Sequence, residues 1–523
     1  MTTRREESDG RVVPEGRRKA VPPARNTRAG KATTASEQAG QRDLFPETAD
    51  SPQGAVPGTE TGRPAPSVRY AVPKSRNTLE DTLPAMTMEA VTNHGNLMCA
   101  FEEVAQNRGA PGPDGRSIDE VRKHLGELLP ALRRALLDGT YRPGTIRRVW
   151  IPKAGGGERG LGIPDVVDRW VQQAVHRVLS PHWEPTFHAS SHGFRPGRSC
   201  HTAIAEAKTY LESGYEWVVD LDLEKFFDRV HHQRLMARLE TKVQDRRLTA
   251  LIHRMLNAKV VMPDGVVVST EEGVPQGGPL SPLLSNIVLD ELDRELARRG
   301  DHFVRYADDA NIYVRSERAG HRVMASVVRV IERRLRLTVN QAKSAVARPE
   351  ERHVVGFSLR RKPEDGSVEV FLSKRSKTRI DERIRALTPR AWGQSLKGCI
   401  ATLNTYLRGW LNFFGTSCTD AVGRTLHNLD AHIRRRLRAL LLRQWKRRRF
   451  IVRRLIRMGA RPSTAWRVVY EGRKALWALR HCGPVDYALD KRYFADHGLF
   501  SLEHRYREMH RVTAPAQLTL ALE

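Results

Sequence analysis

The stretch Phe303-Val-Arg-Tyr-Ala-Asp-Asp-Ala-Asn-Ile-Tyr-Val314 places two adjacent carboxylates, Asp308 and Asp309, between two short runs rich in Val, Ile, Tyr and Phe. This pattern predicts a β-hairpin with an acidic turn. A solvated turn is the commoner explanation of such a pair, but neighbouring acids repel one another unless a cation lies nearby. Mg²⁺ binds through a few carboxylates together with substrate phosphates. The hairpin therefore suggests phosphoryl-transfer chemistry, and it requires a third carboxylate from another strand.

The segment Trp217-Val-Val-Asp-Leu-Asp-Leu-Glu-Lys-Phe-Phe-Asp228 supplies a candidate for the third carboxylate. Side chains alternate along a strand, so Asp220 and Asp222 share one face and the apolar residues share the other. An acid within an apolar strand is costly unless it is paired or metal-bound. We take Asp222 as the candidate and leave Asp220 open as its neighbour. Asp228, at the end of the run, is expected to cap the segment that follows.

The composition indicates a polyanionic partner. Lys and Arg number 88 against 60 Asp and Glu, a net charge of +28 over 523 residues, which favours nucleic acid over an anionic membrane. No apolar run approaches the ~18 residues of a membrane span, and the polar N-terminus does not resemble an export signal. The five cysteines are scattered without a CxxC pair. This argues against zinc ribbons and zinc-bearing nuclease modules, and it fits a reduced cytosol.

Composition divides the chain into regions. Residues 1–80 hold nine of the 29 prolines and only two aromatic residues, which predicts a disordered extension. It is either a dispensable tail or a basic arm that tethers RNA. Residues 81–365 alternate strand-like and helical patterns, so we expect an α+β domain there. Residues 366–460 and 461–523 are expected to be helical and basic.

A dense basic run lies in the helical part of the chain. Residues 431–460 carry twelve Lys or Arg and no acid. A single charged run is usually a solvated helix face, but so many unopposed charges favour a phosphate-binding surface. The candidate nucleic-acid contacts in this run are Arg434, Arg435, Arg438, Lys446, Arg447 and Arg448.

Tyr306-Ala-Asp-Asp309 resembles the catalytic hairpin of reverse transcriptases, in the form typical of group II intron-encoded proteins. Other blocks follow in that family's order, so the resemblance covers about residues 94–505 and is specific. These blocks are Arg108-Gly-Ala-Pro-Gly-Pro-Asp-Gly115, Ile151-Pro-Lys153, Arg159-Gly-Leu-Gly-Ile-Pro164, His192-Gly-Phe-Arg-Pro-Gly-Arg-Ser199, Gly273-Val-Pro-Gln-Gly-Gly-Pro-Leu-Ser281, Leu337-Thr-Val-Asn-Gln-Ala-Lys343, Val355-Gly-Phe357 and Tyr406-Leu-Arg-Gly-Trp-Leu-Asn-Phe-Phe414. One departure is Gly160, where the family usually has Pro. We expect it to loosen the loop after Arg159.

The resemblance implies a right-hand polymerase. Fingers and palm would occupy residues 81–365, a helical thumb or maturase domain residues 366–460, and a basic nucleic-acid-binding region residues 461–523. It also implies two Mg²⁺ ions, with Mn²⁺ as a substitute. The implied metal-binding positions are Asp222, Leu223, Asp308 and Asp309, and the three acids among them would be the catalytic residues.

The same resemblance assigns roles to residues around the acids. Lys153 and Arg159 flank a glycine-rich loop that would close over a triphosphate; the alternative is an exposed hairpin with ordinary surface cations. The Gln276 amide would bond the incoming nucleotide, or it belongs to an ordinary helix-entry turn. Phe227 would lie under the sugar and select deoxynucleotides, and it also suits a plain core position. Lys343 would touch primer or triphosphate phosphate, or it is a surface lysine.

Arg195 and Arg198 lie among glycines. We expect them to contact the template backbone, although they could merely brace a loop. In the maturase-like block, Tyr406, Trp410 and the Phe413–Phe414 pair share one helical face. A core stripe is the favoured interpretation over base stacking.

We interpret the chain as the RNA-directed DNA polymerase of a group II intron, which would copy intron RNA and bind it to assist splicing and retrohoming. The expected partners are intron RNA, an RNA template with a DNA primer, dNTPs and target DNA, with no membrane and no oligomeric state assigned. No Cys/His nuclease module follows residue 505, as in bacterial lineages that lack the endonuclease. A bacterial cytoplasm, with nucleoid association, is the expected location.

Two alternatives stay open. The chain could be a splicing cofactor that binds RNA without polymerising, although binding alone needs none of the three acids. It could also be a reverse transcriptase recruited to a host role such as defence. The maturase-like block favours the intron-borne interpretation.

Overall fold

The structure is a computed structural model of the chain. It describes residue 83 and residues 85–152, 157–389, 393, 395–419, 422–471 and 475–513. The predictions for residues 1–80 and for Lys153 lie outside these ranges. Helices and strands are mixed as expected for the α+β class. Within the described ranges, no helix has the length and apolar character that crossing a bilayer would need.

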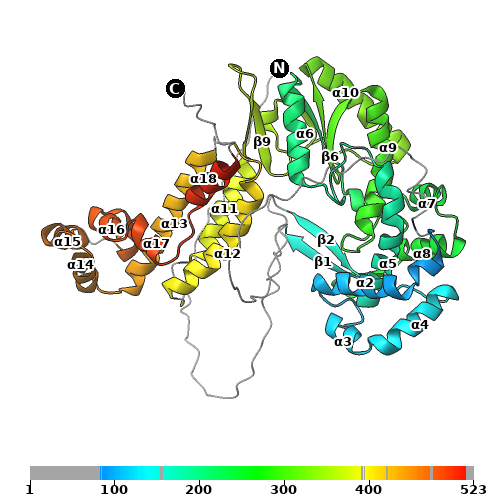
Figure 1. Cartoon of the computed structure of the whole chain (residues 1–523), viewed down its shortest axis with the longest axis horizontal. Coiled ribbons are helices and arrows are strands. Elements are labelled where there is room, and N and C mark those ends of the chain that lie inside the picture. Colours follow the sequence, from blue (N-terminus) through cyan, green and yellow to red (C-terminus); the bar gives the residue numbers. More distant parts are fainter. Residues whose placement is uncertain are drawn as a thin grey trace, which may run out of the picture. The chain divides into compact units, whose positions relative to one another are not determined.

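The predicted acidic hairpin belongs to a four-stranded antiparallel sheet with the strand order β6–β7–β3–β8 (Figure 1). Its strands are β3 (Trp217–Leu221), β6 (His302–Tyr306), β7 (Asp309–Val314) and β8 (Ala345–Ala347). The hairpin strands β6 and β7 pair with one another, and β3 lies between β7 and β8. The strand that leads to Asp222 is therefore the direct neighbour of the acidic hairpin.

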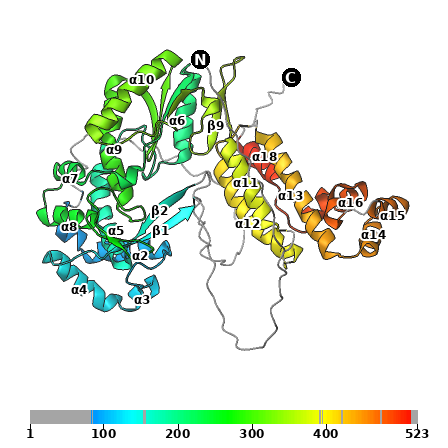
Figure 2. The same cartoon turned by 180° about the vertical axis from the view of Figure 1, so that it is seen from behind.

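Both faces of this sheet are buried. Val219 and Ile312 point into a core shared with α5 (Val166–Trp183), α9 (Ser281–Arg299) and α10 (Glu317–Val330). Val218 and Tyr313 point into a second core shared with α6 (Cys200–Glu212). Figure 2 shows helices α6, α9 and α10 beside this sheet. Burial on two faces explains why these strands are apolar nearly throughout instead of alternating.

Helix α9 supports the sheet through a stripe of apolar residues that recur every four positions. Leu284, Val288, Leu292 and Leu296 are all at most 9% exposed. A proline in its first turn begins the helix, and Gly300, with a φ of +74°, ends it. Both positions follow the usual preference of these residues for helix ends.

A second sheet has the strand order β2–β1–β4–β5. Its first two strands form an antiparallel hairpin, and β4 pairs with β1 in parallel. The strands are β1 (Ile146–Pro152), β2 (Glu158–Ile163), β4 (Val260–Val261) and β5 (Val267–Val268). The remaining helices before residue 260 are α1 (Met88–Val91), α2 (His94–Gln106), α3 (Ile118–Lys123), α4 (Leu125–Leu137), α7 (His232–Glu240) and α8 (Arg246–Leu256).

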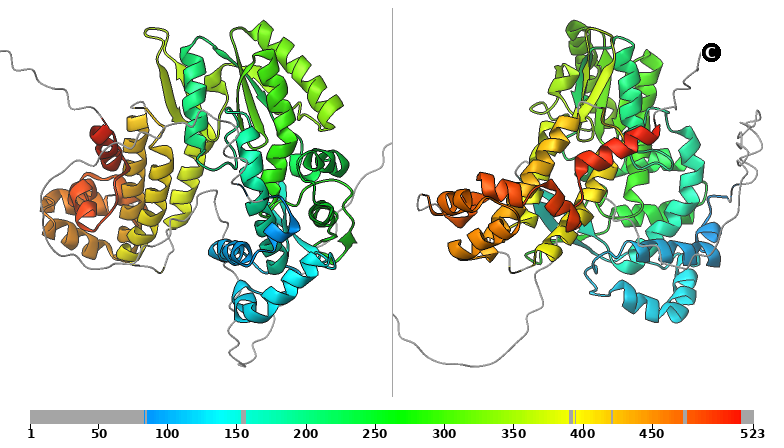
Figure 3. Two further views of the ribbon diagram at one scale, coloured as in Figure 1. Left: turned by 45° about the vertical axis from the view of Figure 1, so that its right-hand side comes forward. Right: turned by 60° about the vertical axis from the view of Figure 1, so that its left-hand side comes forward.

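From residue 374 onward the described chain is helical, as predicted (Figure 3). A hairpin of β9 (Phe357–Arg361) and β10 (Val368–Leu372) precedes the helices, and the predicted boundary at 365/366 falls in its turn. Trp410 and Phe414 are buried with ring centroids 4.9 Å apart, which supports the core interpretation of that stripe. The helices are α11 (Lys374–Leu387), α12 (Leu396–Phe414), α13 (Gly423–Gln444), α14 (Arg448–Arg457), α15 (Pro462–Tyr470), α16 (Gly483–Ala488), α17 (Lys491–Asp496) and α18 (Leu502–Thr513).

Candidate active site

A two-residue turn joins β6 to β7. Tyr306 pairs directly with Asp309, which leaves Ala307 and Asp308 as the turn. Ala307 has a φ of +58°, a conformation that glycine usually occupies in such hairpins. Gly193 lies against this turn, and a Cβ at that position would come 2.2 Å from the Ala307 amide nitrogen. The loop that carries Gly193 therefore fits closely around the acidic turn.

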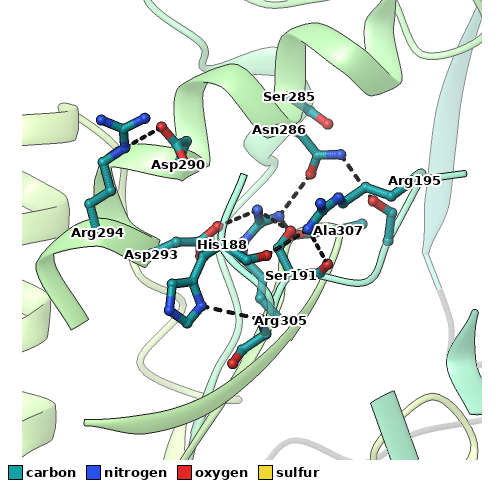
Figure 4. A network of polar contacts seen from close by, with 12 residues as sticks. His188, Ser191, Arg195, Ser285, Asn286, Asp290, Asp293, Arg294, Arg305 and Ala307 are labelled. Atoms are coloured by element: carbon teal, nitrogen blue, oxygen red, sulfur yellow. Dashed lines mark hydrogen bonds and ion pairs between the residues drawn. The ribbon is translucent and has the colours of Figure 1, made fainter. Parts of the chain in front are cut away.

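A buried arginine, Arg305, fixes the turn through hydrogen bonds (Figure 4). Arg305 is 1% exposed. Its guanidinium forms two hydrogen bonds, of 2.7 and 2.6 Å, with the Asp293 carboxylate on α9. It also donates to Asn286 Oδ1 at 3.0 Å, to Ser191 Oγ at 2.6 Å and to the Ala307 carbonyl at 2.9 Å. The strained turn is thus held by a charge-assisted network whose donors and acceptors are paired.

The sequence prediction did not include this network. Arg305 stands between Val304 and Tyr306 inside an apolar strand, and a charge in that position needs a buried partner. That signal was available, but Asp293 and Ser191 come from a helix and a loop whose packing the sequence does not reveal.

The β3–β7 register brings Asp222 beside the acidic turn. Val219 pairs with Ile312 and Leu221 pairs with Ala310, so the next antiparallel step sets Asp222 opposite Asp309. Residues directly opposite in such a pair have Cα atoms roughly 4.5–5.5 Å apart. The structure therefore brings the three predicted acids to one edge of the sheet.

The two acids of the β3 segment have different cationic partners. Lys343 Nζ lies 3.3 Å from Asp222 Oδ2, and Arg352 Nε donates to Asp220 Oδ2 at 2.8 Å. The Asp220 side chain is 16% exposed and the Asp222 side chain 32%. Of the two, Asp222 is therefore the more accessible to a ligand, which favours it as the site residue.

Negative charge accumulates at this edge. Burial raises the pKa of Asp308, and repulsion from Asp222 adds to the shift, while Arg159 opposes it. Asp309 is exposed on one side, yet desolvation by the surrounding protein raises its pKa to about 7, with repulsion from Asp308 adding to the shift. A cation bound among these carboxylates would relieve the repulsion.

The donor set suits a hard divalent cation, because it consists of carboxylate oxygens without Cys or His. Leu223, the other predicted metal position, is buried and pairs with Val339. Within the described ranges, no three His, Cys, Asp or Glu side chains are already grouped as metal ligands. Asp222 is turned toward Lys343 instead, so a cation at this carboxylate would compete with the lysine ammonium.

Phe227 and Gln276 lie in two segments that contact each other. Phe227, in the short helix η3 (Phe226–Asp228), is 8% exposed, and its carbonyl accepts a hydrogen bond from Val274 N at 2.6 Å. The Gln276 carbonyl accepts one from Gly162 N at 2.8 Å. Phe227 is therefore a core residue in this structure, as the alternative allowed, and a role under a sugar stays a prediction.

Two expectations for the neighbouring segments were wrong. Asp228 does not cap a helix; it pairs with Arg148 at 3.1 Å, and α7 begins four residues later. Gly160 lies in β2 and not in a loose loop, and a Cβ there would come 2.8 Å from Arg148 Cζ. The space that a side chain would need at Gly160 is filled by the Arg148 guanidinium. Arg159, in the same strand, is exposed, and its role at a triphosphate stays a prediction.

Comparison with known protein families identifies two domains. The reverse transcriptase (RNA-dependent DNA polymerase) family matches residues 151–359, which include all three acids, and the group II intron, maturase-specific domain matches residues 377–457. The chain carries a reverse transcriptase domain followed by a group II intron maturase-specific domain.

Individual relatives agree with these domains. Protein YkfC of Escherichia coli (strain K12) is 43% identical over 193 residues, which are 36% of this chain and 50% of that protein. The group II intron-encoded protein LtrA of Lactococcus lactis subsp. cremoris is 38% identical over 196 residues, 37% of this chain and 32% of that protein. The matched region spans half or less of these relatives' own length.

Solved structures give weaker similarity. A telomerase from Candida albicans aligns with a TM-score of 0.35 and 14% identity, over 57% of this chain and 59% of that one. A chain of a partial Cas6-RT-Cas1–Cas2 complex aligns with a TM-score of 0.31 and 24% identity, over 47% of this chain and 42% of that one.

In the reverse transcriptase domain, the structure favours the bracing role for the two loop arginines. The Arg195 side chain is 6% exposed and pairs with Glu184. It donates to the His188 and Ser191 carbonyls at 2.6 and 2.8 Å. Arg198 donates to the Ala189 carbonyl at 2.6 Å. Arg195 therefore stiffens the loop that carries Gly193 and has few donors left for a template.

The predicted nucleic-acid contacts in the maturase-specific domain divide into two groups. Arg438 is 11% exposed, pairs with Asp486 and donates to the Leu489 carbonyl at 2.8 Å. Arg448 donates to the Val469 carbonyl. These two arginines connect helices, so the expectation that they face nucleic acid is not supported. Lys446 and Arg447 are exposed, and Arg434 and Arg435 are half-buried.

Proposed function

We propose that the chain is the RNA-directed DNA polymerase of a group II intron, which copies intron RNA into DNA and binds that RNA to assist splicing and retrohoming. One observation supports the proposal: the β3–β7 pairing ends at Leu221 and Ala310, so Asp222 and Asp309 directly follow and precede the last paired residues, with Asp308 next to Asp309, inside the reverse transcriptase domain. A polymerase needs clustered carboxylates at the growing primer end. A protein that only binds RNA does not, because clustered acids repel phosphate.

The carboxylates of Asp222, Asp308 and Asp309, with the backbone carbonyl of Leu223, would hold Mg²⁺ or Mn²⁺. When bound, the metal lowers the pKa of a primer 3′-hydroxyl and offsets the charge on leaving pyrophosphate. The chain's own contribution is position. Arg305 fixes the turn through the Ala307 carbonyl, so Asp308 in the turn and Asp309 next to it are held in place before substrate arrives.

The surrounding residues fit a nucleotide site. Arg159 is exposed on β2 and close enough to Asp308 to lower its pKa against the effect of burial, so it can meet a triphosphate bound at the acids. Gln276 lies in the turn that contacts β2. Lys343, already beside Asp222, is placed to neutralise a phosphate oxygen when that carboxylate turns to a cation.

In this proposal the β3–β6–β7–β8 sheet is the palm, the β1–β2 hairpin belongs to the fingers, and α11–α13 form the thumb. Exposed cations such as Lys446 and Arg447 bind intron RNA. Intron RNA, a primed template, dNTPs and target DNA are the partners, in a bacterial cytoplasm or nucleoid.

Primer extension tests the proposal. The full chain is incubated with an RNA template, a DNA primer, dNTPs and Mg²⁺, and cDNA is quantified. Asp222→Asn and Asp308→Asn should each lower the rate by at least ~10³-fold, while Asp119→Asn, which removes an exposed acid on α3, should have no effect. If the parent chain makes no cDNA but still promotes splicing of an intron RNA, the splicing-cofactor function replaces the polymerase.

A further inference from the structure

One face of the β1–β2 hairpin carries the groups that contact the segments of Phe227 and Gln276. Arg148 pairs with Gly162 and Trp150 pairs with Gly160 across the hairpin, so these four residues share that face. A Cβ at Gly162 would come 2.9 Å from the Ile146 side chain and 3.5 Å from Pro275 Cβ. The two glycines therefore leave this face thin, and other groups lie directly on it.

The Arg148 guanidinium occupies the space over Gly160. A Cβ at Gly160 would lie 2.8 Å from both Cζ and Nε of Arg148. The guanidinium also stacks on Trp150, with Cζ 5.2 Å from the ring centroid. A planar cation between an aromatic ring and a bare backbone is held in one orientation.

From this position above Gly160, the Arg148 side chain reaches Asp228, which lies outside the hairpin. Its Nη2 donates to Asp228 Oδ1 at 3.1 Å. Asp228 directly follows Phe227, and the Phe227 carbonyl is bonded to Val274, two residues before Gln276. We call the two contacting segments that carry Phe227 and Gln276 the floor. Two separate connections join the hairpin to this floor: the Gly162–Gln276 backbone hydrogen bond and the Arg148–Asp228 ion pair.

We propose that Arg148 is a positioning residue: seated over Gly160, it ties the β1–β2 hairpin to Asp228 and so sets the spacing between Arg159 on the hairpin and Phe227 on the floor. The pairing of Ile146 and Arg147 with β4 and the Gly162–Gln276 bond hold the base of the hairpin, and without Arg148 its tip could pivot about that base. The second connection fixes its angle, and with it the depth of the site that receives a nucleoside triphosphate. This inference rests on the proposed polymerase function.

Gly160→Ala is the sharpest test, because it acts on Arg148 without touching Arg148. Gly160 does not have a positive φ, so alanine fits its backbone, and the group that must move is the end of a flexible side chain. We expect the KM for dNTP to rise about fivefold with kcat within about twofold, which is the signature of a loss in substrate positioning. The melting temperature should stay unchanged. Gly126→Ala, at an exposed open position on α4, is the matched control.

A double-mutant cycle separates this mechanism from a general disturbance. Arg148→Met should raise the KM as Gly160→Ala does, and the Gly160→Ala/Arg148→Met pair should be no worse than either single variant, since both break the same interaction. Arg148→Lys keeps the charge opposite Asp228 and should restore part of the effect. Additive single-variant effects, or an unchanged KM in Gly160→Ala, would overturn the proposal.

Amide hydrogen exchange gives a readout that does not need catalysis. In Gly160→Ala, exchange should accelerate in residues 146–152 and 158–163 and stay unchanged in the β3–β6–β7–β8 sheet. If the parent chain makes no cDNA and hairpin exchange is still faster in Gly160→Ala, the polymerase function is refuted, and the role of Arg148 in positioning the hairpin is supported. Unchanged exchange in an active enzyme would refute the positioning role alone.

Discussion

Lys343 Nζ lies 3.3 Å from Asp222 Oδ2 and forms an ion pair with it. The lysine side chain is 64% exposed, so this pair is screened and its contribution to stability is small, about 0–1 kcal/mol. Its significance is competitive. In the proposed polymerase, an ammonium paired with Asp222 would oppose a metal ion at the same carboxylate, and a bound metal would free that ammonium for a substrate phosphate.

Lys343→Met should therefore change the Mg²⁺ requirement and the KM for dNTP in opposite directions. The Mg²⁺ concentration that gives half-maximal primer extension should fall about two- to fivefold at pH 8, the factor that up to ~1 kcal/mol of relieved competition gives. The KM for dNTP should rise, because the variant has no ammonium to pair with a substrate phosphate. Titrations of Mg²⁺ and of dNTP in the same assay measure both. A higher Mg²⁺ requirement in the variant would show that Lys343 does not compete with the metal.

The charge on Asp309 should cost stability in the metal-free protein. Its folded-state pKa is about 7, against an ordinary value of 3.8. The contribution of Asp309 to stability is therefore most favourable below pH 3.8 and becomes less favourable as the pH rises toward 7, because the folded state holds a proton at this carboxyl that the unfolded chain has lost. Asp309→Asn should raise the melting temperature in EDTA by about 2 °C above pH 7, allowing for partial exposure of the side chain.

This gain should shrink as the pH falls and should vanish near pH 4, while polymerase activity is lost at every pH. Thermal melts of the parent and Asp309→Asn between pH 4 and pH 8.5 measure the difference. A destabilised variant at pH 8 would mean that Asp309 is paired with a cation in the protein alone.

How far the sequence predicts this site depends on which interactions are local. The proximity of Asp222, Asp308 and Asp309 could be predicted because strand periodicity and turn position locate these acids without knowledge of packing. The positive charge of Arg195 suggested a template contact. The sequence does not show that this side chain donates to backbone carbonyls of its own loop. Gly160 misled for a similar reason: the side chain that fills its space, Arg148, comes from the partner strand.

Arg305→Met should be strongly destabilising. It would leave the Asp293 carboxylate, which is fully buried, without its cation, and breaking such a pair from one side costs about 3–5 kcal/mol. Urea denaturation measures the change in the free energy of unfolding. Arg305→Met combined with Asp293→Leu should cost less than the sum of the two single changes, because neither charge is then left unpaired. Simple additivity would mean that the two residues act separately.

Gly193→Ala should lower activity with a smaller loss of stability. Its Cβ would meet backbone atoms of the turn, 2.2 Å from Ala307 N and 2.9 Å from Ala307 Cα, and backbone cannot move aside as a side-chain end can. The acidic turn itself must shift, and we expect the primer-extension rate to fall more than ~10-fold, since small misplacements at a reacting centre are costly. Gly126→Ala serves as the control, and wild-type activity in Gly193→Ala would contradict the close fit.

RNA binding should depend on the exposed cations and not on the braced ones. Replacing Lys446, Arg447, Arg449 and Arg453 with Gln removes four exposed charges from the α13–α14 region. The slope of log affinity against log salt should flatten by about 0.7–0.9 for each phosphate that is no longer neutralised. Filter binding of an intron RNA at several salt concentrations measures this slope.

The matched control removes four exposed arginines around α10, namely Arg318, Arg322, Arg329 and Arg333. Arg438→Gln should instead lower the melting temperature, because that side chain connects α13 to Asp486. If the α10 set flattened the slope and the α14 set did not, the RNA-binding surface would lie on the reverse transcriptase domain.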